Sequence, residues 1–158
     1  MTNAEFVYTT YIKSTPEKVW SAITNPEFAF QYWGGLGIIS DGKKGSKWKL
    51  SNSKNDNTHW VGEILETTPP KRLVLSWVSP TNEADASRVT FEIEPFEDLV
   101  RLNVVHNDFK AGFDTISKIS GGWPRVLSSL KSFLETGRGL NVMAGKGTCG
   151  SPSTGAAA

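Results

Sequence analysis

Alternation of apolar and polar residues dominates the first two thirds of the chain. Between residues 88 and 94, apolar residues occupy the odd positions and polar residues the even ones. A period of two predicts a strand with one buried and one wet face. Similar alternation, or runs rich in β-branched and aromatic residues, predicts strands at about 5–13, 37–40, 47–51, 59–70, 71–79, 87–96 and 99–107. Short turns between successive strands favour an antiparallel meander.

Helical signals flank this run of strands. "STPEKVW" and "TNPEF" each place a capping residue before a proline suited to a first helical turn, which predicts two short helices, the second reaching about Tyr32. Apolar residues recur at helical spacing from Trp123 to Leu134 and predict a long helix that covers the sheet. Because proline is tolerated only in a first turn, we expect this helix to begin near Pro124 and end at Gly137, with a separate shorter helix at 113–119.

These elements make an α+β domain. A length of 158 residues suits one domain with a proper core, which we expect over residues 1–140. Residues 141–158 are rich in Gly, Ser, Thr and Ala without periodicity, which predicts a flexible tail.

Composition and charge exclude several function classes. A formal net charge of +1 gives no broad attraction to nucleic acid or to an anionic membrane. The single cysteine, Cys149, excludes an internal disulfide and fits a reducing compartment. No secretory signal and no apolar run long enough to span a bilayer is visible, so we expect a cytoplasmic protein without a membrane span.

Catalytic and metal-binding motifs are missing from the sequence. His59 and His106 fall on different predicted strands, and neither has a second His or Cys at metal-ligand spacing. Neither a nucleophile elbow nor a phosphate-binding glycine motif is present. We therefore expect no metal and no cofactor, and we name no catalytic residue.

The aromatic residues suggest a cavity instead. A single long helix laid across a strongly curved sheet leaves space beneath it, and each large ring then belongs either to the core or to a pocket lining. His106 shares its strand face with Val100, Leu102 and Val104, so it is either a satisfied core histidine or a polar anchor in the pocket. The candidate ligand-binding residues are Tyr32, Trp33, Trp48, Trp77, Phe91, His106, Trp123 and Leu127.

Four stretches carry a family resemblance: "YIKSTPEKVWSAITNPEFAFQYWGG", "GEILETTPPKRLVLSW", "RLNVVHNDF" and "SGGWPRVLSSLKSFLETG". They resemble the branch of the START-like (SRPBCC) superfamily named for the C-terminal domain of the activator of the heat-shock-protein-ninety ATPase. The resemblance implies a helix-grip fold, a curved antiparallel sheet wrapped around a long C-terminal helix. Members of the wider superfamily bind lipids, sterols, polyketides or plant hormones, a few catalyse cyclisations or hydrolyses, and the eukaryotic co-chaperone relatives bind a chaperone.

Three functional hypotheses follow. The leading one is binding of a small, largely apolar molecule, with polar selection by His106 and Tyr32. The second is a cavity enzyme of the polyketide cyclase or hydrolase type, with His106 or Glu63 as acid–base residue. The third is a co-chaperone-like interaction module whose partner is a chaperone. In each case we expect a monomer or weak dimer.

Overall fold

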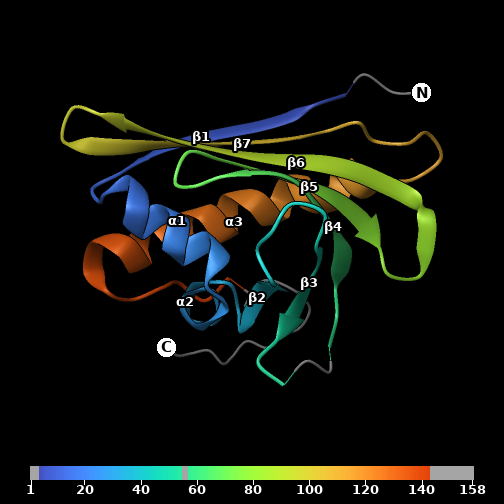
Figure 1. The fold of residues 1–158 in the computed structure, drawn as a ribbon, viewed down its shortest axis with the longest axis horizontal. Coiled ribbons are helices and arrows are strands. Elements are labelled where there is room, and N and C mark those ends of the chain that lie inside the picture. The colour runs from blue at the N-terminus through green and yellow to red at the C-terminus, as the bar shows by residue number, and fades with distance from the viewer. Residues whose placement is uncertain (1–3, 55–56, 143–158) are drawn as a thin grey trace.

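The computed structural model describes residues 4–54 and 57–142. Its elements follow the predicted order (Figure 1). They are β1 (Phe6–Ile12), α1 (Pro16–Thr24), α2 (Pro26–Tyr32), β2 (Leu36–Ser40), β3 (Lys47–Asn52), β4 (Trp60–Thr68), β5 (Arg72–Ser79), β6 (Asn82–Phe96), β7 (Leu99–Asn107) and α3 (Thr115–Thr136).

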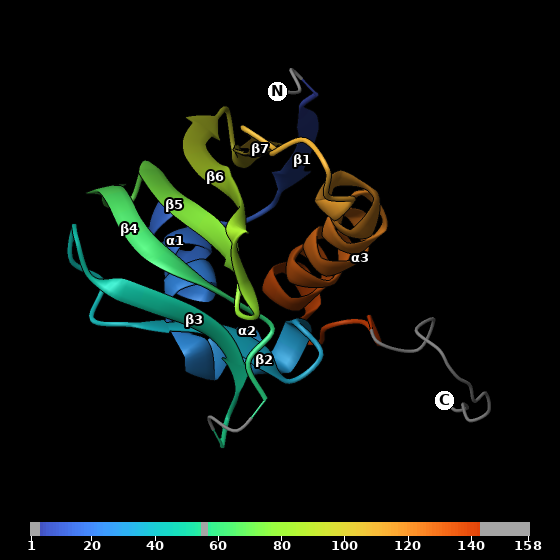
Figure 2. The ribbon, with the colours of Figure 1, turned by 90° about the vertical axis from the view of Figure 1, so that its right-hand side faces the viewer.

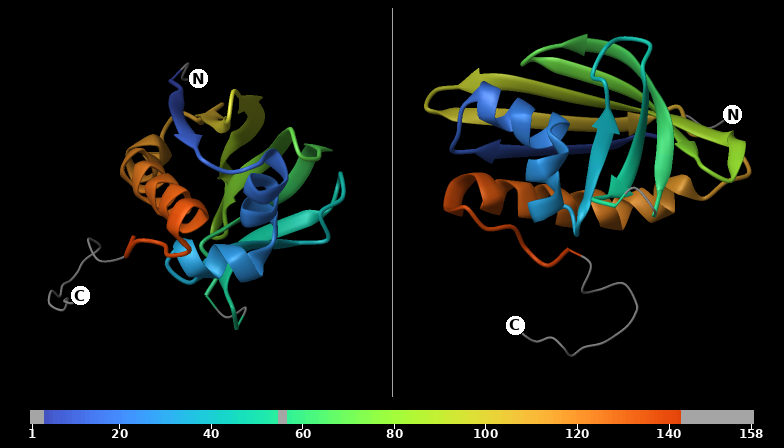
Figure 3. Two further views of the ribbon diagram at one scale, coloured as in Figure 1. Left: turned by 90° about the vertical axis from the view of Figure 1, so that its left-hand side faces the viewer. Right: turned by 60° about the horizontal axis from the view of Figure 1, so that its bottom comes forward.

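One antiparallel sheet of seven strands forms the body of the domain, in the order β1-β7-β6-β5-β4-β3-β2. Since β1 pairs with the last strand, helices α1 and α2 carry the chain from one edge of the sheet to the other. The sheet curves around α3, which lies on its concave side (Figures 2 and 3). This is the α+β helix-grip architecture that the sequence predicts.

The two faces of the sheet differ as the alternation indicates. On β6 and β7 the concave side chains are buried, among them Phe91, Leu102 and His106. The convex face is polar: Arg72 forms ion pairs with Glu66 at 3.0 Å and with Glu92 at 2.6 Å. The core therefore lies between the concave face and α3.

The short helices close one end of this core. Thr15 caps α1 by accepting from the Lys18 N–H at 3.2 Å, and Asn25 caps α2 by accepting from the Glu27 N–H at 3.0 Å. Gly34 and Gly35 follow α2 with φ of 62° and 85°, left-handed values that glycine adopts without strain. The turn they form leads the chain directly into β2.

Helix α3 differs from the prediction. It is one continuous helix of 22 residues with Pro124 inside it, so the separate helix at 113–119 and the first-turn position of Pro124 are wrong. Pro124 has no N–H to donate to the Ser120 carbonyl, and Gly121 and Gly122 disfavour helix. Burial of Ile119 before this weak segment, Trp123 within it and Leu127 after it outweighs those local preferences. The predicted end at Gly137 is confirmed, with a left-handed φ of 86°.

The chain beyond α3 folds back onto the domain. The Leu140 N–H donates to Ser129 Oγ at 2.6 Å, and Val142 is only 5% exposed. The packed chain therefore extends at least two residues past the expected boundary at 140. The rest of the predicted tail, with Cys149, lies outside the described residues. Within the described ranges, no helix is long and apolar enough to cross a membrane.

Candidate functional site

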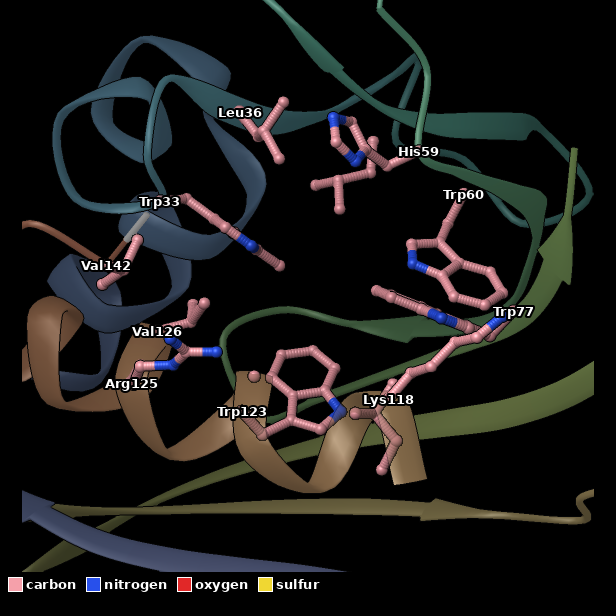
Figure 4. A pocket seen from close by; sticks show the side chains of 13 residues that line it. Trp33, Leu36, His59, Trp60, Trp77, Lys118, Trp123, Arg125, Val126 and Val142 are labelled. Carbon is pink, nitrogen blue, oxygen red and sulfur yellow. The ribbon is translucent and has the colours of Figure 1, made fainter. Parts of the chain in front are cut away.

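A half-open pocket of about 260 Å³ lies between α3 and the strands β2–β5 (Figure 4). The backbone of α3 comes closest to β1, α1 and α2, and the pocket lies on its other side, toward β2–β5. Four tryptophans dominate the lining: Trp33, Trp60, Trp77 and Trp123. Leu36, Leu50, Ile119, Val126 and Val142 add aliphatic surface, and His59, Lys118, Gly122 and Arg125 complete it.

The four tryptophans of the lining form an aromatic wall, and Trp77 lies at its centre. Its ring centroid lies 5.6 Å from that of Trp60, 5.4 Å from that of Trp123 and 5.0 Å from that of Trp48. Trp33 contacts Trp123 from the other side, at 5.8 Å. Tilted ring pairs at these separations are favourable beyond their buried area, so the wall is preorganised.

His106 lies behind this wall. It is 0% exposed, and its Nδ1 accepts from the Trp123 indole N–H at 3.1 Å. Because an indole nitrogen can only donate, His106 carries its proton on Nε2 and donates to Ser87 Oγ at 2.7 Å. Burial lowers the pKa of His106 to about 3, so the ring is neutral near neutral pH. His106 thus has the geometry of a core histidine that holds Trp123 in position.

Three of the eight candidate residues line the pocket: Trp33, Trp77 and Trp123. The other five, Tyr32, Trp48, Phe91, His106 and Leu127, are buried outside its lining. The Tyr32 hydroxyl donates to the Ala22 carbonyl at 2.9 Å, and burial raises its pKa. Neither Tyr32 nor His106 therefore presents a polar atom to the pocket.

Sequence reasoning missed most of the polar lining. Lys118, Gly122 and Arg125 stand at i, i+4 and i+7 on one face of α3, a spacing visible only when the helix is continuous. Trp60 could have been found, because it shares its strand phase with the buried Ile64.

The residues named for acid–base catalysis do not meet in this pocket. Glu63 is exposed and lies outside the lining, and both ring nitrogens of His106 are engaged inside the protein. Within residues 4–54 and 57–142, His, Cys, Asp and Glu side chains nowhere gather in groups of three or more that could hold a metal ion.

Comparison with known proteins finds matches that cover most of the chain. The family model described as Activator of Hsp90 ATPase homolog 1-like protein matches residues 13–135. The Aha1 dimer from Colwellia psychrerythraea is similar over 86% of this chain and 99% of its own, with a TM-score of 0.72 and 23% identity.

Two further solved structures are similar. An HSP90 activator from Plasmodium falciparum, PFC0360w, matches over 83% of this chain and 96% of its own, with a TM-score of 0.71 and 25% identity. CalU16 from Micromonospora echinospora matches over 88% and 79%, with a TM-score of 0.70 and 22% identity. No match was found among curated protein sequences.

Proposed function

This chain belongs to the Activator of Hsp90 ATPase homolog 1-like family, and on that basis we propose that it binds a small, largely apolar ligand in the pocket between α3 and the sheet. The observation that carries the proposal is the wall of four tryptophans around a preformed space. Ligand pockets are concave, mostly apolar and rich in aromatic residues, with a few polar groups that orient the ligand.

The size of the pocket limits the ligand. A volume of about 260 Å³ lies just below the range typical of drug-sized ligands. A molecule of one or two fused rings suits this space better than a sterol or a long acyl chain. Burial of its apolar surface against the indole rings would supply most of the affinity.

Two glycines of α3 provide a test of this proposal. Gly122 lines the pocket, whereas its neighbour Gly121 does not, and a side chain added at either position meets open space. Gly122→Leu should fill the pocket opening, and Gly121→Leu should leave it free. Native mass spectrometry of protein purified gently from its own cells should show an added mass, lost on denaturation, in the wild type and in Gly121→Leu but not in Gly122→Leu.

Other outcomes would contradict the proposal. Equal added mass in all three proteins would place the ligand elsewhere. The absence of added mass from the wild type would contradict a retained ligand.

The family also favours a second candidate, a module that binds a chaperone. The specific observation is the 25% identity to the Plasmodium falciparum HSP90 activator across nearly the whole domain. A surface interaction of this kind does not need the pocket. If the domain binds a chaperone, the wild type and Gly122→Leu should capture it equally well. If the domain only binds a small ligand, neither of these proteins nor Gly121→Leu should capture a chaperone.

A further inference from the structure

We propose that the ligand of this pocket carries a carboxylate that Arg125 binds, so that the natural ligand is a small aromatic acid. This inference rests on the proposed function and names the chemical class of ligand for the same pocket. Three observations lead to it. The charged residues of the lining are all positive, Arg125 has no ion-pair partner among the described residues, and a tryptophan of the wall has an indole N–H without an acceptor.

The charged residues of the lining share one sign. Lys118 and Arg125 both reach the pocket from α3, and the described lining contains neither Asp nor Glu. The chain as a whole is nearly neutral, with a formal net charge of +1, so the positive charge of the lining does not simply follow from the overall charge. A low-dielectric cleft lined by one sign of charge attracts ligands of the opposite sign.

The two cations differ in their own partners. Lys118 Nζ lies 3.6 Å from an oxygen of Asp114, one turn back along α3. Arg125 Nε donates to the Gly121 carbonyl at 3.1 Å, and no carboxylate in the described chain forms an ion pair with it. Figure 4 shows the guanidinium of Arg125 directed toward the pocket beside Trp123. The Nε hydrogen bond orients the group and leaves its two terminal nitrogens for a planar carboxylate.

The wall itself leaves a donor unused. The indole nitrogen of Trp77 is buried and has no hydrogen-bond partner among the described residues. By contrast, the Trp123 indole N–H donates to His106, and the Trp48 N–H donates to the Ser76 carbonyl at 2.9 Å. The cations of the described lining, Lys118 and Arg125, are likewise donors, which favours a ligand that carries acceptor atoms.

A pair of isosteric probes isolates the charge. 2-Naphthoate and 2-naphthamide share two fused rings and differ in the carboxylate. Binding can be followed by ¹H–¹⁵N NMR on the six indole N–H signals. Trp20 on α1 does not line the pocket, so its signal serves as an internal control for location. We expect 2-naphthoate to bind about three- to tenfold more tightly than 2-naphthamide at low salt, and the difference to shrink as ionic strength rises.

Substitution assigns the contact to one residue. Arg125→Gln should weaken 2-naphthoate about three- to tenfold and leave 2-naphthamide unchanged. Arg138→Gln is the matched control, since Arg138 is exposed and lies outside the lining. Arg125 is also exposed, so its replacement should not disturb folding.

The outcomes separate this inference from the proposed function. Equal affinity for the two probes at the pocket tryptophans would overturn the acid inference and leave the apolar pocket supported. A preference for 2-naphthoate that survives Arg125→Gln would overturn the assignment to Arg125. If neither probe shifts the pocket signals, both the inference and the proposed function fail for aromatic ligands of this size.

Discussion

The hydrogen bond that holds Trp123 in the pocket wall requires His106 to be neutral. Its Nδ1 accepts from Trp123 and its Nε2–H donates to Ser87, so a second proton would break the contact with Trp123. The ring is also stacked on Phe109, with centroids 4.8 Å apart, in a site that water does not reach. Burial favours the neutral form and lowers the pKa of His106.

The first residue-scale prediction concerns pH. The pKa of His106 is about 3 when folded and near 6.5 when unfolded, so the unfolded chain binds the extra proton between these values. Stability from neutral His106 is therefore fully present well above pH 6.5 and falls as pH decreases toward 3, by roughly 2 kcal/mol between pH 6.5 and 4.5. The imidazole Cε1–H signal of His106 should stay at its neutral-form shift from pH 8 down to 5.

A variant at the other histidine identifies the signal. The chain has two histidines, so His59→Gln leaves only the resonance of His106. A midpoint near 6.5 for that resonance would contradict the neutral, doubly engaged ring. His106→Leu should lower stability, because it leaves the buried Trp123 N–H and Ser87 hydroxyl without their partner.

The second residue-scale prediction concerns Gly62. A Cβ at this position would lie 1.9 Å from the Ser76 carbonyl oxygen and 2.6 Å from Trp48 Nε1, so strands β4 and β5 would have to separate. Gly62→Ala should lower the free energy of unfolding by about 2 to 4 kcal/mol in urea denaturation. Gly121→Ala meets no atom within 4 Å in mid-helix and should raise it by roughly 0.5 to 1 kcal/mol. Wild-type stability in Gly62→Ala would show that the Trp48–Ser76 contact does not need glycine.

At the scale of elements, the sequence predicts what depends on local pattern. Alternating apolar residues, with prolines or glycines at their ends, predict the strands. Thr15 and Asn25, each followed by a proline, predict α1 and α2. Helix α3 could not be predicted as one piece, since Gly121, Gly122 and Pro124 all favour a break. Its continuity comes from tertiary burial, which a single sequence does not show.

The same limit applies to the pocket. Strand phase correctly places His106 on the concave face of the sheet. Whether its side chain reaches the pocket depends on which residue of α3 covers it, and strand phase does not show that. Trp123 occupies that place, so Trp123 lines the pocket and His106 lies behind it. The sequence does not predict that Lys118 and Arg125 lie together, because they share a helix face only when α3 continues through Gly121, Gly122 and Pro124.

At the scale of the whole molecule, the two halves of α3 are held differently. In the second half, Lys131 Nζ donates to the Tyr11 carbonyl at 2.7 Å and Glu135 accepts from the Lys13 N–H at 2.9 Å, which ties the helix to β1. The first half is anchored near its start, where the Thr115 hydroxyl donates to Asp85 at 2.6 Å. Between these anchors lies the segment with two glycines and a proline, and the pocket lies beside it.

A ligand in the pocket would therefore contact the weakest part of the helix and the sheet opposite it. We expect hydrogen exchange, measured by mass spectrometry with saturating 2-naphthoate, to slow most in peptides from residues 116–126 and little in those from β1 and β7. At 100 times its Kd the ligand should also add about 2.7 kcal/mol to the free energy of unfolding. Gly122→Leu should show slow exchange in the same peptides without ligand and no further change with it. Protection spread evenly over the sheet would instead indicate that α3 is already rigid along its whole length.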